Sequence, residues 1–148
     1  MMFNFAKILC PVDFDDNSAA ALRFACNLLE LGGTLYLLHA IPKAEAERPG
    51  FEQYPPIREL AQRNLERFAR KEIGDQIVHK LIIRAGDPAA VTVRAADEFG
   101  VDLIVMATHG HRGFVRVVLG SVAERVLRDA GCPVLTLRPA SSRQPPST

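Results

Sequence analysis

The chain has 148 residues, of which 48% are apolar and 24% are charged, and its formal net charge is +1. This length suits one domain with a sizeable core, and the apolar content excludes a largely disordered chain. The near-neutral charge and the lack of a basic stripe leave little to neutralise nucleic-acid phosphates, so we expect no nucleic-acid binding.

The amino-terminal segment and the cysteines indicate the compartment. The apolar run before Asp13 is too short for a secretory signal, and we expect no membrane insertion because no other stretch is long enough to span a bilayer. Cys10, Cys26 and Cys132 have neither metal-knuckle nor redox-pair spacing, and an odd number argues against a disulfide framework. We therefore expect a cytoplasmic protein with buried free thiols.

The first elements predict a parallel sheet. Residues 7–12 form an almost continuous apolar run, which is typical of a strand covered on both faces. Capping side chains follow at 15–18, and apolar residues then recur at helical spacing, which predicts a helix that ends at the pair Gly32 and Gly33. Residues 34–39 repeat the strand character. A strand, a helix and a strand in this order indicate a right-handed parallel crossover.

The rest of the chain continues the alternation. Residues 42–56 are rich in Pro, Glu and Lys without periodicity, which predicts an exposed loop. We interpret residues 1–140 as a single domain and the polar residues 141–148 as a disordered tail. The remaining predicted elements are a helix that starts at Ile57, a strand over 76–84, a helix between Asp87-Pro88 and Gly100, a strand over 103–107, a helix over 121–130 and a strand over 134–137.

Five strands that alternate with four helices predict an open three-layer α/β sandwich around a five-stranded parallel sheet. Ligands of such sheets bind beyond the carboxyl ends of the strands, at the place where the strand order reverses. The loops after the first and the fourth predicted strand are therefore the candidate site.

The segment 106–121 carries the most chemical information. Its three glycines allow tight turns and a close approach of backbone N–H groups, and the helix start at Ser121 offers an anion site. Ser121 and Glu124 also fit a capping box, in which both side chains satisfy amides of the first helical turn. Capping explains the serine and the glutamate but not the glycines, so phosphate binding and plain capping both stay open.

The same segment resembles a known family. Ala107, Gly110, Gly120 and Ser121 have the spacing of the nucleotide-binding signature of universal stress proteins: glycine, two residues, glycine, nine residues, glycine, then serine or threonine. Ala107 departs from this pattern, because the signature has a glycine there. The resemblance implies a Rossmann-like fold of the adenine-nucleotide-hydrolase type with strand order 3-2-1-4-5. It extends in the family's order to residues 7–13, 37–39, 86–88 and 132–134.

The resemblance implies an ATP site, with AMP or cyclic AMP as alternative ligands. Asp13 would contact the ribose or approach the phosphates, and Mg²⁺ arriving with the nucleotide would meet Asp13 through water. Ile41 and Met106 would lie on two sides of the adenine. The implied nucleotide-binding residues are Pro11, Val12, Asp13, Ile41, Met106, Ala107, His109, Gly110, Gly120, Ser121 and Val122.

Several of these residues have simpler interpretations. Asp13 can cap the first helix, although residues 15–18 compete for that role, and Ile41 and Met106 can be core residues. His39, His109 and His111 suggest a metal site, but no zinc-type ligand spacing is present. We therefore expect no metal held by the protein alone.

The resemblance implies a regulatory or stress-response protein that binds nucleotide and is not an enzyme, with a protein partner that is unknown. A slow ATPase or self-phosphorylating enzyme is an alternative, although the chain has no P-loop lysine. A nucleotide-free interaction module is another, which Ala107 favours. The last strand would form an exposed edge, and two-fold pairing there, similar to the family's dimer, would give a homodimer through Val134, Leu135, Thr136 and Leu137.

Overall fold

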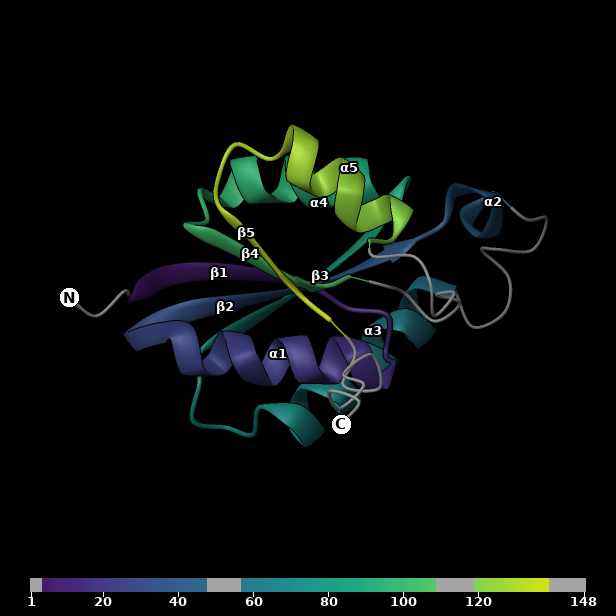
Figure 1. The fold of residues 1–148 in the computed structure, drawn as a ribbon. Helices are drawn as coiled ribbons and strands as arrows, with labels where there is room; N and C mark the ends of the chain where they lie inside the picture. Colours follow the sequence, from purple (N-terminus) through teal and green to yellow (C-terminus); the bar gives the residue numbers. More distant parts are fainter. Residues whose placement is uncertain (1–3, 48–56, 109–118, 139–148) are drawn as a thin grey trace, which may run out of the picture.

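The structure is a computed structural model and describes residues 4–47, 57–108 and 119–138. Within these residues no helix is long and apolar enough to cross a membrane, and the predicted tail at 141–148 lies outside them. Strands and helices alternate along the chain (Figure 1). In order they are β1 (Phe5–Pro11), α1 (Asp16–Leu28), β2 (Leu29–Ile41), α2 (Lys43–Ala46), α3 (Ile57–Glu72), β3 (His79–Ala85), α4 (Pro88–Phe99), β4 (Leu103–Ala107), α5 (Ser121–Asp129) and β5 (Val134–Leu137).

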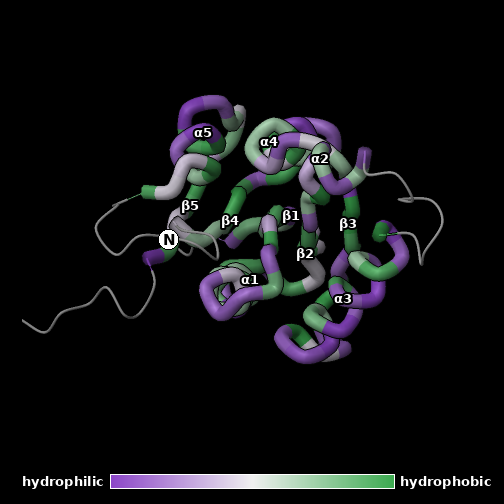
Figure 2. Tube along the Cα trace, turned by 90° about the vertical axis from the view of Figure 1, so that its right-hand side faces the viewer, coloured by the Kyte–Doolittle hydropathy of each residue, from purple (hydrophilic) through white to green (hydrophobic). Residues whose placement is uncertain are grey.

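The strands form one parallel sheet in the order β3-β2-β1-β4-β5. Helices α1 and α3 cover one face, and α4 and α5 cover the other (Figure 2). This confirms the predicted three-layer α/β fold and its strand order. The connections from β1 to β3 run over one face and those from β3 to β5 over the opposite face, so the chain changes face at β3.

Both faces of the sheet are buried, which explains the apolar runs of the strands. Ile8 and Cys10 of β1 belong to the core under α1 and α3, whereas Leu9 belongs to the core under α4 and α5, and all three are fully buried. Figure 2 shows hydrophobic stretches along the strands and a mixture of hydrophilic and hydrophobic residues along the helices. Burial of one such large apolar side chain stabilises the fold by about 1.5–3 kcal/mol.

The three cysteines are free thiols in different surroundings. Complete burial in the core raises the pKa of the Cys10 thiol well above its usual value. Cys26 and Cys132 are only partly buried, which is a correction to the prediction of buried thiols for all three. Partial burial also raises the pKa of both thiols, so the described structure contains no activated cysteine.

Helix α1 begins as predicted but ends earlier. The Asp15 side chain caps it, since Oδ1 accepts the N–H of Ser18 at 2.7 Å. The helix ends at Leu28, and the extended residue Leu29 already pairs with Phe5 of β1, where the register of the two strands is irregular. Residues 29–31, before the glycine pair, therefore belong to β2 and not to the helix. The prediction that the helix reaches Gly32 is wrong.

The other boundaries differ less. The single turn α2 occupies the start of the predicted loop at 42–56, of which residues 48–56 lie outside the described structure. β3 starts three residues later than predicted, at His79. Helix α4 has both predicted end signals: Asp87 caps it by accepting the N–H of Ala90 at 3.0 Å, and Gly100 closes it in a left-handed conformation with φ 61°.

The irregular start of β2 gives a stability prediction. A Cβ on Gly33 would lie 2.8 Å from the carbonyl oxygen of Ala6 and 2.9 Å from Leu29 Cδ1, so the backbone of β1 would have to shift. We expect Gly33→Ala to lower the free energy of unfolding by about 2 kcal/mol in urea denaturation. Leu31→Ala is the control, because Leu31 is fully exposed and its change should stay within about 0.5 kcal/mol. Equal effects of the two variants would contradict the close approach.

Candidate functional site

The candidate site lies at the carboxyl ends of β1 and β4, which are neighbours at the middle of the sheet. The strands pair in parallel, with Ile8 opposite Leu103, and end at Pro11 and Ala107. Helix α1 follows β1 on one face of the sheet, and α5 follows β4 on the other (Figure 2). The two segments therefore diverge at this point, as they do at ligand sites of open α/β sheets.

The structure brings most of the predicted site residues to this edge. Those that it describes lie at the ends of β1, β2 and β4 or in the first turn of α5. His109 and Gly110 lie outside the described residues. The residues placed at this edge are Pro11, Val12, Asp13, Ile41, Met106, Ala107, Gly120, Ser121 and Val122.

The loop that connects β4 to α5, residues 108–120, is attached to the sheet at both ends. The N–H of Gly120 donates to the carbonyl of Thr108 at 2.6 Å, and the N–H of Thr108 donates to the carbonyl of Leu137 at 2.9 Å. The Thr108 side chain is buried. These hydrogen bonds hold the start of α5 beside the end of β4, although the residues between lie outside the described structure.

The structure removes the capping-box alternative for Ser121 and Glu124. Gly120 occupies the N-cap position and has no side chain to cap the helix, while Ser121 is already the first helical residue. The Ser121 hydroxyl is therefore one position too late to cap, and Ser121 is exposed. The first turn of α5 thus presents its backbone N–H groups and the Ser121 hydroxyl at the edge of the sheet, and no side-chain cap occurs among the described residues.

Asp13 does not cap α1, because Asp15 does. The N–H of Asp13 instead donates to Ser18 Oγ at 2.9 Å, which ties the residue after β1 to the first turn of α1. The second oxygen of the capping carboxylate, Asp15 Oδ2, is buried and has no hydrogen-bond partner among the described residues. Asp13 itself is exposed at the carboxyl edge, so the capping alternative for this residue is removed.

Phe14 adopts an unusual backbone conformation that sequence reasoning missed. Its φ is 63°, in the left-handed region that costs a residue with a side chain about 1–2 kcal/mol. Its ring packs on His39 with centroids 4.4 Å apart and meets the edge of Phe68 of α3 at 5.8 Å. His39 Nδ1 lies 2.9 Å from the Val12 carbonyl, and because a carbonyl only accepts, the proton is on Nδ1.

The apolar site candidates are core residues in this structure. Val12, Ile41 and Met106 are each at most 5% exposed. Val12 and Ile41 pack under α1 and α3, whereas Met106 packs under α4 and α5. These three side chains therefore pack beneath the carboxyl edge, on opposite faces of the sheet. Ala107, which stands where the signature has a glycine, is partly exposed.

No group of three metal-binding side chains occurs among the described residues. His39 uses Nδ1 in the hydrogen bond to the backbone after β1. The other two histidines of the metal hypothesis, His109 and His111, lie outside this part of the chain.

Comparison with known proteins decides the family. Residues 4–138 match the model of the universal stress protein family. The chain belongs to this family. Universal stress protein MJ0531 of Methanocaldococcus jannaschii is 32% identical over 142 residues, which cover 90% of this chain and 82% of that protein. Universal stress protein YxiE of Bacillus subtilis is 31% identical over 150 residues, which cover 93% and 100%.

Solved structures agree with the universal stress protein fold. The structure of hypothetical protein MJ0577 of M. jannaschii matches with a TM-score of 0.82 at 30% identity, and the match covers 96% of this chain and 100% of that chain. Hypothetical protein PH0823 matches with a TM-score of 0.71, also at 30% identity, over 93% and 96%. The likeness therefore extends over the whole sheet and both helical layers.

An ion pair that was not predicted joins α4 and α5 of this universal stress protein. Arg125 Nη1 donates to Asp87 Oδ1 at 2.8 Å, and Asp87 Oδ2 accepts the N–H of Ala90 at the start of α4. The hydrogen bond from Arg125, then that from Ala90, lowers the pKa of the Asp87 carboxyl. The two residues are 38 positions apart and both partly exposed, so no local pattern indicates the pair.

This ion pair predicts a pH dependence. A carboxyl whose pKa is lower in the folded than in the unfolded chain stabilises the fold above its unfolded pKa, and this contribution is lost as the pH falls through the folded value. We expect acidification from neutral pH to below pH 4, about the unfolded value of Asp, to reduce the wild-type free energy of unfolding more than that of Asp87→Asn, which keeps a capping oxygen. Asp97→Asn, on the exposed side of α4, is the control, and we expect acidification to reduce its free energy of unfolding as much as that of wild type. Parallel curves for wild type and Asp87→Asn would contradict the pairing.

Proposed function

We propose that this chain is a regulatory protein of the stress response that binds an adenine nucleotide, with ATP as the ligand, at the carboxyl ends of β1 and β4. The observation that carries the proposal is the attachment of Gly120 to Thr108 at 2.6 Å, which holds the uncapped start of α5 beside the end of β4. Backbone N–H groups at a helix start and the helix dipole favour a phosphate there.

The residues around this helix start fit a nucleotide. The Ser121 hydroxyl and the N–H groups of the first turn are donors for phosphate oxygens, while Asp13 is an acceptor for ribose hydroxyls or, through water, a ligand of Mg²⁺. Phosphates next to Asp13 bring negative charges together, and a cation that arrives with the nucleotide relieves this repulsion. We propose a cytoplasmic location because the three cysteines are free thiols, which persist in a reducing compartment.

We propose binding rather than turnover. The chain has no P-loop lysine to contact the β- and γ-phosphates. The nucleotide-free interaction module is the second candidate, and the methyl group of the partly exposed Ala107 favours it, because it occupies the position of the first signature glycine.

The first experiment identifies the ligand. Freshly purified protein is denatured and the released molecules are analysed by mass spectrometry, followed by calorimetric titration with ATP, AMP and cyclic AMP. Cyclic AMP is included because one structural neighbour at 21% identity is a universal stress protein in complex with cAMP. ATP that binds and is recovered intact supports the proposal. Formation of ADP supports the slow ATPase, and no binding of any adenine nucleotide supports the interaction module.

Substitution of Gly120 tests the location of the site. Its φ of −71° and ψ of 159° are extended backbone that valine adopts, so Gly120→Val should fold. The added side chain would stand at the approach to the first turn of α5, and we expect ATP affinity to fall at least tenfold, about 1.4 kcal/mol. Ala90→Val is the control, because Ala90 lies in the first turn of α4 and is exposed. Unchanged affinity in Gly120→Val would remove the site from α5.

We also propose a homodimer through the edge of β5. The two edges of the sheet differ: β3 carries Lys80 and Arg84, and such charges on an edge strand oppose pairing with another chain. β5 has no charged residue over 134–137. The carbonyls of Pro133 and Leu137 accept bonds from the β4 side, so the alternation of a parallel ladder directs the main-chain groups of Thr136 outward.

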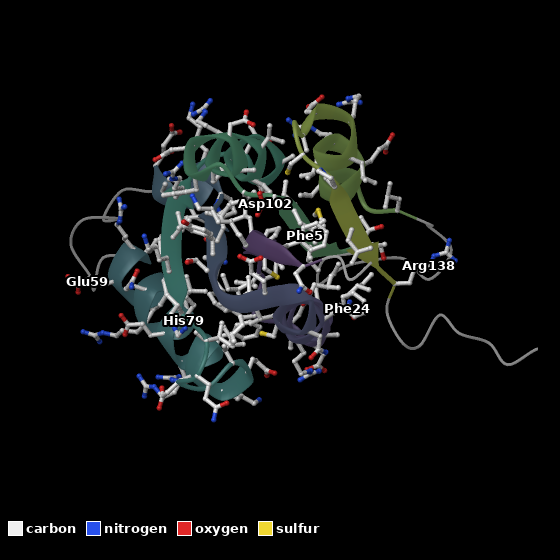
Figure 3. The ribbon with its side chains drawn as sticks, turned by 90° about the vertical axis from the view of Figure 1, so that its left-hand side faces the viewer. Phe5, Phe24, Glu59, His79, Asp102 and Arg138 are labelled. Carbon is white, nitrogen blue, oxygen red and sulfur yellow. The ribbon has the colours of Figure 1, made fainter. Side chains whose placement is uncertain are left out.

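Exposed apolar side chains flank this edge in both helical layers. In α1, Arg23 pairs with Glu72 of α3, and Phe24, one position further around the helix, is 42% exposed. Figure 3 shows Phe24 on the side of the molecule where β5 ends. In α5, Arg125 faces α4, whereas Leu127 lies on the opposite side of the helix and is 43% exposed. Both side chains therefore extend the β5 edge into an apolar surface that suits a second copy.

Thr136→Pro tests the dimer. Proline removes one outward N–H, and it is tolerated on an edge strand where that N–H does not join the ladder. We expect the dimer dissociation constant in sedimentation velocity to rise at least tenfold. Thr136→Val is the control, because it keeps the N–H and the branched shape. A wild-type sedimentation profile for the folded proline variant would exclude pairing at this edge.

A further inference from the structure

We propose that Phe14 is a positioning residue for Asp13: its left-handed backbone, held by the rings of His39 and Phe68, fixes the direction in which the Asp13 carboxylate leaves the end of β1. The inference rests on the proposed function, in which Asp13 meets the nucleotide. It adds a residue that contacts no ligand and that acts only through its neighbour.

The first step is the conformation itself. Among the described residues Phe14 is the one non-glycine with a positive φ, 63°. A large aromatic residue avoids this region, and it stays there only when the surrounding contacts determine it. The segment after β1 is therefore not a relaxed turn, and something outside it must hold the Phe14 backbone.

The second step is what holds it. The Phe14 ring packs on His39 of β2 with centroids 4.4 Å apart and an interplanar angle of 34°, and it meets Phe68 of α3 edge-on at 5.8 Å. Tilted and edge-to-face pairs at such distances are favourable beyond their buried area. His39 also donates from Nδ1 to the Val12 carbonyl at 2.9 Å, so one side chain contacts the segment on both sides of Asp13.

The third step is the effect on Asp13. Val12 donates its N–H to Leu38 at 2.8 Å, and Asp13 donates its N–H to Ser18 Oγ at 2.9 Å. With the Phe14 ring fixed from the far side, the backbone of Asp13 is held by β2, α1 and α3 at once. A glycine at position 14 would satisfy the same φ but would bring no ring, so the contacts with His39 and Phe68 would be lost.

The test measures positioning with and without a ligand. Residue-resolved amide hydrogen exchange by NMR follows the Asp13 N–H in nucleotide-free protein, and calorimetry gives the ATP affinity. In Phe14→Leu, which keeps an apolar side chain but loses both ring pairs, we expect Asp13 exchange to rise about tenfold and ATP affinity to fall about tenfold. The matched control is Phe99→Leu, which removes another ring pair, with Tyr36 at 5.0 Å, on the opposite face of the sheet. It should leave both values unchanged.

A double-mutant cycle separates positioning from a general loss of structure. If Phe14 acts through Asp13, Phe14→Leu has no further effect on ATP affinity in the Asp13→Asn background. Equal losses in both backgrounds would overturn the proposal, as would unchanged Asp13 exchange in folded Phe14→Leu. Should Phe14→Leu fail to fold, Phe68→Leu removes the α3 contact alone, and the same rule decides. If wild-type protein binds no adenine nucleotide, the proposed function fails, and the exchange data alone still decide whether Phe14 positions Asp13.

Discussion

The parallel pairing of β1 with β4 determines where a ligand can bind at the carboxyl edge of the sheet. β1, β2 and β3 are connected over the face of α1 and α3, and β3, β4 and β5 over the face of α4 and α5. Between β1 and β4 the following segments leave toward opposite faces and also away from each other, one toward β2 and the other toward β5. The hydrogen bonds of Gly120 and Thr108 then attach the start of α5 to β4 and β5. The position of the candidate site therefore follows from the topology, whereas its side chains determine which ligand fits there.

Electrostatics at this edge is divided between two elements. The start of α5 presents the positive end of a helix dipole, whereas three carboxylates, Asp13, Asp15 and Asp16, lie around the start of α1. Asp15 caps α1 and Asp16 lies in its first turn, so both act on their own helix. Asp13 has neither of these roles in α1 and lies directly after β1 and Val12. A ligand between α5 and Asp13 would meet a donor side and an acceptor side, which suits a molecule with phosphates at one part and hydroxyls at another.

Sequence patterns predict those parts of this structure that depend on neighbouring residues. The strands were found because burial on both faces leaves continuous apolar runs, and α4 because Asp87 and Gly100 mark its two ends. The predicted end of α1 is wrong because Leu29 pairs with Phe5, and helical periodicity gives no sign of this contact between strands. The capping box failed because the position of Gly120 is set by Thr108, at the other end of the loop. The Phe14 conformation and the Asp87–Arg125 pair depend on side chains distant in sequence, and no local signal indicates them.

The magnitudes explain why a strained residue can persist at this edge. A left-handed phenylalanine costs about 1–2 kcal/mol, while a single fully buried leucine such as Leu37 contributes about 1.5–3 kcal/mol. The strain at Phe14 therefore cancels roughly the stabilisation that one buried side chain contributes, and the core on both faces of the sheet tolerates it. The strain is placed between Asp13 and the cap of α1, and not inside a strand, where it would break the ladder. A relaxed segment would make the fold slightly more stable but would lose the ring contacts that we propose to orient Asp13, so stability and positioning oppose each other at this residue.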